Sequence, residues 1–269
     1  MKRIGLFSVP RSGSSWLGEL INSSPDVCYL FQPLFSYAFK SYLDSTSKKD
    51  DVIDFFNKIK STKDEFVLQS SSRASGSKPH FKEKEECPNN IVFKEVRYLN
   101  LIENLLFEDD EIKIVGLVRN PLSVLNSWKN APREFRIDLG WNFKDEWFDA
   151  KSKNQTKDEE YFGYKKWKES TLLFESLAKT YPDRFIIVNY ENLVNDTLGE
   201  VTRLYNFLDI DISSQTLDFI NASTSLTTKE TYSVFNGKLK SDPLLDIPQS
   251  IVDFIVSDCN ESNLDKYLM

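Results

Sequence analysis

The sequence has little histidine, cysteine or methionine, with one, three and two residues of each among 269, and no long apolar run. Its cysteines, Cys28, Cys87 and Cys259, are far apart and odd in number. They fit neither a zinc site nor a disulfide framework, and they are more typical of a reducing compartment. No apolar stretch approaches the roughly 20 residues of a membrane span, and an apolar strand pattern begins almost at Met1. We therefore expect no metal, no integral membrane segment, no signal peptide and a cytoplasmic location.

The chain is acidic. A formal net charge of −7 and a pI near 5.0 leave no general basic field for nucleic acid, so any anion must bind at a local site. Hydrophobic residues make up 40% of the chain, which is enough for a sizeable core. No linker or internal repeat divides the sequence, and we expect one domain over residues 1–269.

The first 20 residues predict an anion site. Residues 4–9 form an apolar strand pattern, residues 10–15 are a loop of small residues, and a helical pattern follows from Trp16. This layout aims free backbone N–H groups and the positive end of a helix dipole at one spot. The alternative is an ordinary strand–turn–helix unit in which Ser12 caps the helix without any ligand.

This loop differs from the loop that binds nucleoside triphosphates. Aligned on G-x-x-x-x-G-K-[ST], the chain has Ser8 in place of the first glycine and Ser14 in place of the lysine. Because that lysine is missing, the nearby cation is Arg11. A donor less highly charged than ATP suits such a loop.

A second unit of the same kind follows later in the chain. Residues 112–118 are a clearly apolar strand that leads into Arg119 and then a helix with Pro121 in its first turn. Ser127 lies two turns into that helix. Further expected strands are 27–31, 66–68, 91–97 and 185–188, expected helices are 35–43, 52–59, 99–106, 161–179 and 197–208, and 70–90 is expected to be a long exposed loop. This alternation predicts an α/β fold: a central parallel sheet with helices on both faces and ligands at the carboxyl ends of the strands.

Both loops carry a family resemblance. Residues 10–17 resemble the 5′-phosphosulfate loop of sulfotransferases that use 3′-phosphoadenylyl sulfate (PAPS), and residues 18–34 are similar to the carbohydrate 6-O-sulfotransferases in particular. Residues 115–128 resemble the 3′-phosphate loop of the same family. Residues 93–97 resemble the strand end between the two loops, and residues 188–193 resemble a late Tyr-Glu-x-Leu strand.

The resemblance implies a P-loop-like α/β fold. Animal carbohydrate sulfotransferases are tethered by an N-terminal membrane helix, and because no such segment is expected here, we expect a soluble, bacterial-type enzyme. Its activity would be transfer of a sulfuryl group from PAPS to a hydroxyl of a carbohydrate or glycoconjugate, with adenosine 3′,5′-bisphosphate (PAP) as product and no metal. It places Arg11 against the leaving phosphosulfate, with Lys94 in support. The nucleotide would be held by Arg11, Ser12, Gly13, Ser14, Ser15, Trp16, Arg119, Ser127 and Tyr190.

The expected catalytic residues are Arg11, Gln32 and Lys94, and Gln32 departs from the family pattern. Several relatives carry a glutamate there, which takes the proton from the acceptor, whereas a glutamine amide can only orient the hydroxyl. His80, Glu95 and Glu19 are the other candidates for the base. Two alternative functions remain: a nucleotide-binding protein on the sulfotransferase scaffold with lost or weak catalysis, and a P-loop nucleotide kinase.

Overall fold

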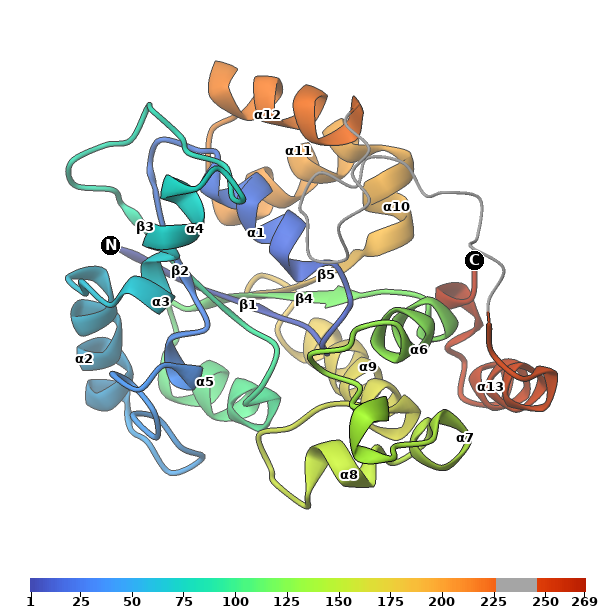
Figure 1. Ribbon diagram of the computed structural model, residues 1–269. Coiled ribbons are helices and arrows are strands. Elements are labelled where there is room, and N and C mark those ends of the chain that lie inside the picture. The colour runs from blue at the N-terminus through green and yellow to red at the C-terminus, as the bar shows by residue number, and fades with distance from the viewer. Residues whose placement is uncertain (226–245) are drawn as a thin grey trace.

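A computed structural model describes residues 1–225 and 246–269. Within these residues, the centre of the molecule is a five-stranded sheet in the order β2-β3-β1-β4-β5, and every neighbouring pair is parallel (Figure 1). The strands are β1 (Lys2–Phe7), β2 (Val27–Phe31), β3 (Asn90–Glu95), β4 (Lys113–Val118) and β5 (Phe185–Asn189). The predicted parallel sheet is confirmed.

The strands form around short apolar runs, because both faces of the sheet are buried. In β1, Ile4 and Leu6 point into one hydrophobic cluster and Phe7 points into the other. Val92 and Phe93 divide between the two clusters in the same way in β3. This period of two is the reason that one short run of residues can anchor helices on two sides.

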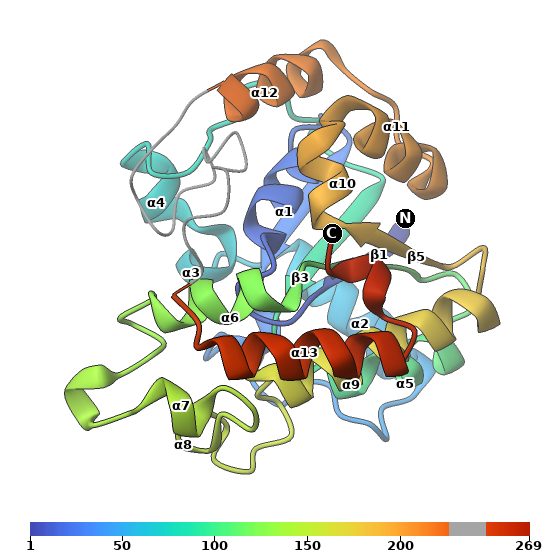
Figure 2. The same ribbon diagram turned by 90° about the vertical axis from the view of Figure 1, so that its right-hand side faces the viewer.

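Helices cover both faces, as predicted (Figure 1). One face carries α1 (Ser14–Asn22), α10 (Tyr190–Asn195), α11 (Thr197–Leu208) and α12 (Ser214–Ser225). The other face carries α2 (Lys49–Lys60), α5 (Ile102–Glu108), α6 (Pro121–Lys129), α9 (Tyr164–Thr180) and α13 (Gln249–Glu261). Figure 2 shows α13 alongside α6, which it contacts.

Shorter elements fill the edges. The helices α3 (Glu65–Leu68) and α4 (Ser70–Ala74) lie near β2 at one edge of the sheet, and α3 contacts that strand (Figure 1). The helices α7 (Phe143–Glu146) and α8 (Lys151–Asn154) follow α6 in the chain. The remaining described elements are four single 3₁₀ turns: η1 (Pro33–Phe35), η2 (Leu99–Leu101), η3 (Ile137–Leu139) and η4 (Asp265–Tyr267).

Three local predictions are wrong, in whole or in part. Residues 35–43 are not a helix but turns that follow η1, although Phe39 and Leu43 are buried. Residues 66–68 are not a strand: they belong to α3, which begins because the Asp64 carboxylate accepts the Val67 N–H at 2.8 Å. A run of three apolar residues is too short to show either period. The expected loop 70–90 begins with α4 and is irregular only after it.

A buried ion pair joins the two strands that carry the candidate loops. Arg3 of β1 donates to the Asp109 carboxylate from Nε at 2.5 Å and from Nη2 at 2.8 Å. Asp109 is fully buried and lies just before β4. The Arg184 guanidinium donates in turn to the carbonyl of Asp109 at 2.8 Å. The pair therefore fixes β1 and β4 at the end of the sheet opposite their loops.

We predict that Asp109→Ala lowers the free energy of unfolding by up to about 3–5 kcal/mol, because Arg3 loses its buried two-point partner and keeps only the exposed Glu111 carboxylate, which accepts its Nη2 at 2.8 Å. Denaturant titration measures this change. The matched control is Asp138→Ala, which removes an ion pair with Arg136 on the surface and should leave the unfolding midpoint nearly unchanged. Equal effects of the two substitutions would contradict a structural role for the buried pair.

Candidate active site

The loop after β1 is built as an anion cradle. Arg11 and Gly13 both have positive φ, 71° and 91°, and α1 begins directly after them at Ser14. The N-cap of α1 is Gly13, with no side chain capping the helix, so the alternative in which Ser12 is the cap is wrong. Instead, the Ser12 hydroxyl is fully buried and has no hydrogen-bond partner in the described parts of the chain. A buried hydroxyl without a protein partner can bond a polar ligand or a water molecule.

Gly13 is required by its surroundings as well as by its φ. A Cβ at this position would lie 2.3 Å from Cε2 of Tyr190, so the aromatic ring occupies the space that any other residue would need. Tyr190 directly follows β5 and is the first residue of α10, not part of a strand as the Tyr-Glu-x-Leu resemblance implied. The loop after β1 therefore packs on a residue that follows the edge strand β5, two strands away in the sheet.

Arg119 follows β4 and stacks on the same ring. Its guanidinium carbon is 4.5 Å from the centroid of Tyr190, and its Nη1 donates to the Arg11 carbonyl at 3.2 Å. Trp167 of α9 holds the Arg119 carbonyl through its indole N–H at 2.9 Å. The Arg119 Nε is buried and has no acceptor within residues 1–225 and 246–269. Arg119 is therefore fixed in position while its Nε–H remains available to donate a hydrogen bond.

Arg11 and Ser127 meet across the two loops. Nε of Arg11 donates to Ser127 Oγ at 3.1 Å, and Nη1 lies 3.7 Å from a carboxylate oxygen of Glu134. Ser127 comes from α6, whose first turn is fixed by Pro121 and by the Asn120 side chain, which accepts the Leu122 N–H at 2.9 Å. The two strand–loop–helix units thus bring their predicted side chains into direct contact.

The start of α1 contributes backbone donors. Helix geometry leaves the N–H groups of Gly13, Ser14 and Ser15 without an acceptor inside the helix, whereas the Trp16 N–H is bonded to the Gly13 carbonyl at 3.0 Å. The Trp16 indole donates to Ser223 Oγ at 3.0 Å, and its ring meets the edge of Tyr190 with centroids 6.1 Å apart. These donors, the buried Ser12 hydroxyl and Arg119 fit a nucleotide with two phosphate groups.

Lys94 and Glu95 are buried neighbours at the carboxyl end of β3. Burial lowers the pKa of Lys94 to about 7, with Lys78 nearby adding to the effect. Burial also raises the pKa of Glu95 to about 8. Oε1 of Glu95 accepts the Leu34 N–H at 2.8 Å, while Oε2 has no partner among the described residues. Pairs with pKa values displaced in this way are typical of functional sites.

Gln32 follows β2 at the same edge of the sheet. Its backbone has φ 43°, and its N–H donates to the Lys94 carbonyl at 2.8 Å. The side-chain oxygen of Gln32 is buried and, in the part of the chain that the structure describes, accepts no hydrogen bond. The three predicted catalytic side chains therefore follow or end three strands that are consecutive in the sheet, at their carboxyl ends, where ligands bind in sheets of this kind.

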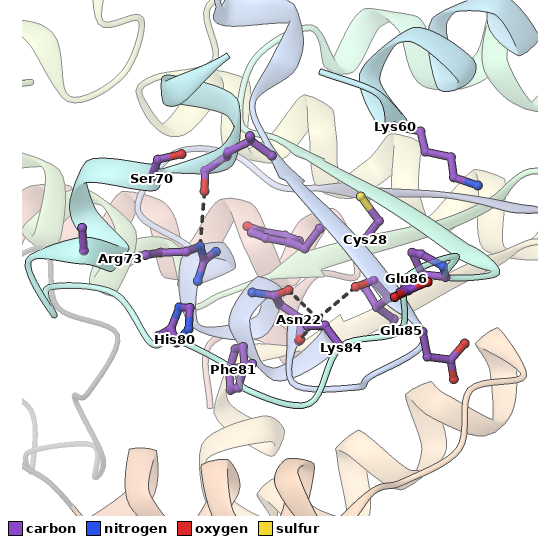
Figure 3. A pocket seen from close by; sticks show the side chains of 15 residues that line it. Asn22, Cys28, Lys60, Ser70, Arg73, His80, Phe81, Lys84, Glu85 and Glu86 are labelled. Atoms are coloured by element: carbon purple, nitrogen blue, oxygen red, sulfur yellow. Dashed lines mark hydrogen bonds between the residues drawn. The ribbon is translucent and has the colours of Figure 1, made fainter. Parts of the chain in front are cut away.

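The other candidates for the general base differ in how far their side chains are already buried or hydrogen-bonded. Glu19 is almost fully buried in α1, and its carboxylate is engaged by Arg73 at 2.9 Å and by the Asn22 amide at 2.8 Å. His80 is exposed and lines a pocket elsewhere (Figure 3). Glu95 is the one among these three that shares a strand end with Lys94.

The pocket that contains His80 lies away from the two loops. Its cavity volume is about 630 Å³, and its walls come from the amino-terminal half of β2, the end of α1, α4 and the segment after α4. Lys84 closes one side by donating to the Asn22 and Val27 carbonyls at 2.5 and 2.9 Å (Figure 3). Asn22 and Ser14 are the two ends of α1, which is about 13 Å long. This pocket is therefore distinct from the region at the start of α1.

Two supporting residues were missed at the sequence level. Glu134, which faces Arg11, lies in the irregular stretch 131–160, where no periodicity predicts a position. Trp167 sits on the buried face of α9 and reads as an ordinary core residue, yet its N–H holds the carbonyl of Arg119. Only the adjacency of β4 and α9 could have shown that role.

The described residues contain no group of three or more His, Cys, Asp or Glu side chains placed to hold a metal ion. Across the same residues, no helix combines the length and apolar character needed to cross a membrane.

Known proteins share this architecture. A mouse sulfotransferase solved as a complex with PAP has a TM-score of 0.58 with this chain at 16% identity, covering 99% of this chain and 87% of that one. This likeness shows the fold, which is the P-loop-like fold of sulfotransferases.

Sequence relatives point to the same family. Carbohydrate sulfotransferase 4 of the mouse is 25% identical over 75% of this chain and 63% of its own length. For mouse carbohydrate sulfotransferase 5 the identity is 26%, over 80% of this chain and 65% of that protein. The chain thus spans a little under two thirds of the length of these relatives. The profile of the family described as Sulfotransferase domain matches residues 2–250, and the chain belongs to the sulfotransferase family.

Proposed function

We propose that this chain transfers a sulfuryl group from PAPS to a hydroxyl group of a carbohydrate or glycoconjugate. The observation that carries the proposal is the convergence of two loops, in which Arg119 stacks on Tyr190 beneath Gly13 and Arg11 reaches Ser127. Family membership argues against the nucleotide-kinase alternative. The mouse neighbour that binds PAP and the carbohydrate sulfotransferases among the relatives support the donor and the class of acceptor.

The nucleotide would lie across the two loops. The free N–H groups of Gly13, Ser14 and Ser15 and the Ser12 hydroxyl would hold the 5′-phosphate, because these donors converge at the start of α1. Arg119 and Ser127 would hold the ribose 3′-phosphate, which a planar guanidinium and a hydroxyl suit well. Trp16 and Tyr190 would act mainly by positioning, since Tyr190 supports both Gly13 and Arg119.

Bound PAPS supplies an activated sulfuryl group whose leaving group is PAP. Sulfuryl transfer resembles phosphoryl transfer, with a loose in-line transition state that needs positioning and neutralisation of charge more than covalent help. Arg11 and Lys94 are cations on adjacent strand ends and would neutralise charge on the leaving group. Lys94, with its pKa near 7, would be held in the charged form once an anion lies beside it.

At the acceptor hydroxyl, this chain has Gln32 where several relatives carry a glutamate base. The amide of Gln32 would orient the acceptor hydroxyl through its unpaired oxygen. The Glu95 carboxyl, whose pKa burial raises to about 8, would accept the proton only in its ionised form, which is favoured at higher pH. If neither group removes the acceptor proton, the protein would bind the nucleotide and turn over slowly or not at all, which is the second candidate function. The presence of glutamine at position 32, in place of a glutamate, favours this second function.

Transfer of labelled sulfate from PAPS to a panel of glycans and simple pyranosides tests the proposed function. We expect incorporation into at least one sugar, with PAP released in equal amount and no requirement for added metal. Binding of PAP without transfer to any acceptor in the panel would support the binding-protein alternative. Failure to bind PAP at all would refute both.

We predict that Arg119→Ala weakens PAP binding by roughly ten- to a hundredfold, because a lost charge-assisted hydrogen bond typically costs about 1.5–3 kcal/mol. Calorimetric titration with PAP measures the loss. The affinity for adenosine 5′-phosphate, which lacks the 3′-group, should change little. As a control, Arg203→Ala on the exposed face of α11 should leave both affinities unchanged. Equal losses for the two nucleotides would remove Arg119 from the 3′-phosphate site.

We predict that Gln32→Glu raises turnover if the native site lacks an efficient base, since a positioned base typically contributes about 10²–10⁴-fold. The carboxylate should also add an ascending limb to the pH–rate profile, because the base is active only above its pKa. Steady-state rates from pH 5 to 9 on one acceptor measure both effects.

Companion variants separate a deficient site from a relocated base. If Glu95 already takes the proton, Glu95→Gln should abolish turnover and Gln32→Glu should slow it by repelling the sulfuryl oxygens. His80→Ala should have no effect, because His80 lines the pocket at the far end of α1. An unaltered rate and pH profile for Gln32→Glu would show that this side chain is not near the acceptor.

A further inference from the structure

Three phenylalanine rings gather where the edge strand β2 ends, and we call them the aromatic platform: Phe31, Phe35 and Phe66. The ring centroids of Phe31 and Phe66 are 5.5 Å apart, and those of Phe35 and Phe66 are 5.9 Å apart. Phe35 is 46% exposed and Phe66 is 41% exposed. The platform is therefore contiguous, and two of its three rings are open to solvent.

The platform is not accounted for by packing alone. The α3 helix is anchored through its neighbour Val67, which is buried, and through the Asp64 cap, so the fold does not need the Phe66 ring for that contact. Single exposed aromatic residues are common on protein surfaces and need no explanation. Neighbouring exposed rings at the carboxyl edge of a parallel sheet are different, because that edge is where ligands bind.

Charged and polar groups surround the rings. The Arg97 guanidinium carbon is 4.0 Å from the Phe35 centroid, and Lys94 Nζ is 4.5 Å from the Phe31 centroid. Gln32 lies between Phe31 and Phe35 in the chain, with the buried side-chain oxygen that has no partner in the described structure. The platform thus adjoins the residues proposed to act on the acceptor and the sulfuryl group.

This combination has the chemistry of a sugar-binding surface. A pyranose ring presents a face of C–H bonds, which are weakly positive, and the negative face of an aromatic ring attracts them. Its hydroxyls project around the rim, where planar donors such as Arg97 and the amide of Gln32 can reach them. A phenol offers an apolar ring with a single hydroxyl, so it would engage fewer of these polar groups than a pyranose, although Arg97 also keeps its ion pair with Glu160.

We propose that Phe35 and Phe66 bind one pyranose ring of the acceptor by stacking and direct one of its hydroxyls toward Gln32 and Lys94. This inference rests on the proposed function and extends it, since it names the chemical class of the group that sits beside the reacting oxygen. The platform binds the acceptor sugar and makes no contact with the nucleotide.

Separate measurements of sugar binding and of turnover test the role of the aromatic platform. Saturation-transfer NMR in the presence of PAP reports whether methyl β-galactopyranoside, methyl β-glucopyranoside or 2-naphthol binds, whether or not any of them is sulfated. The variants are Phe66→Ala, Phe35→Ala and Phe66→Leu, which keeps apolar volume without the ring and serves if the alanine variants fold poorly. Phe107→Ala is the matched control, because Phe107 is 77% exposed on α5 just before β4, at the opposite end of the strands.

We expect binding of at least one pyranoside, weakened roughly three- to tenfold by each of the three platform variants and restored by Phe66→Tyr. PAP affinity should be unchanged in all variants, and Phe107→Ala should match the parent protein. For any pyranoside that is sulfated, KM should rise by the same factor while kcat changes little.

Other outcomes overturn the proposal in distinguishable ways. Sugar binding that is unaffected by Phe66→Leu and Phe35→Ala would remove the platform from the acceptor site. Binding of 2-naphthol with no binding of either pyranoside would assign the platform to phenols. Platform-dependent sugar binding without any sulfate transfer would uphold the platform and refute the proposed function instead.

Discussion

The contact on which the rest of the site depends is the packing of Gly13 against the Tyr190 ring, on which Arg119 also lies. Tyr190 fills the volume where a side chain at position 13 would lie, and the Arg119 guanidinium rests on the ring and reaches back to the Arg11 carbonyl. Three strand ends, those of β1, β4 and β5, are therefore locked together by one aromatic ring. With the ring in place, the backbone amides at the start of α1 and the guanidinium of Arg119 face the same region with donors unused.

An acidic chain can offer an anion a site only where its cations are concentrated. Arg11, Lys94 and Arg119 lie at or just beyond the ends of three adjacent strands, and none of them is fully exposed. Burial strengthens their interaction with an anion because the local dielectric constant is low, and it also displaces the pKa values of Lys94 and Glu95. Such arrangements destabilise the folded protein until a ligand arrives, which is why they persist mainly at functional sites.

Much of the fold could be read from the sequence because both faces of the sheet are buried. The runs at 4–9, 91–97 and 112–118 each have an apolar centre, and each is followed by a polar loop and a helical pattern. The meeting of Arg11 with Ser127 follows from these units once β1 and β4 are neighbours. The secondary structure of residues 35–43 and 66–68 could not be predicted from the sequence. Turns and single helical turns bury these short segments at the edge of the sheet, and runs this short show no clear helical or strand periodicity. The aromatic platform depends on that same edge, and spacing in the chain does not bring Phe66 beside Phe31 and Phe35.

The central claim is that the two loops form a site for a nucleotide with a 3′-phosphate and not for a triphosphate. Calorimetric titration of the unmodified protein with PAP and with ATP tests it most directly. The loops offer Arg119 and Ser127 for a 3′-phosphate and lack the lysine that reaches β- and γ-phosphates, so PAP should bind at least about tenfold more tightly. Binding of ATP as tight as that of PAP, or tighter, would contradict the account.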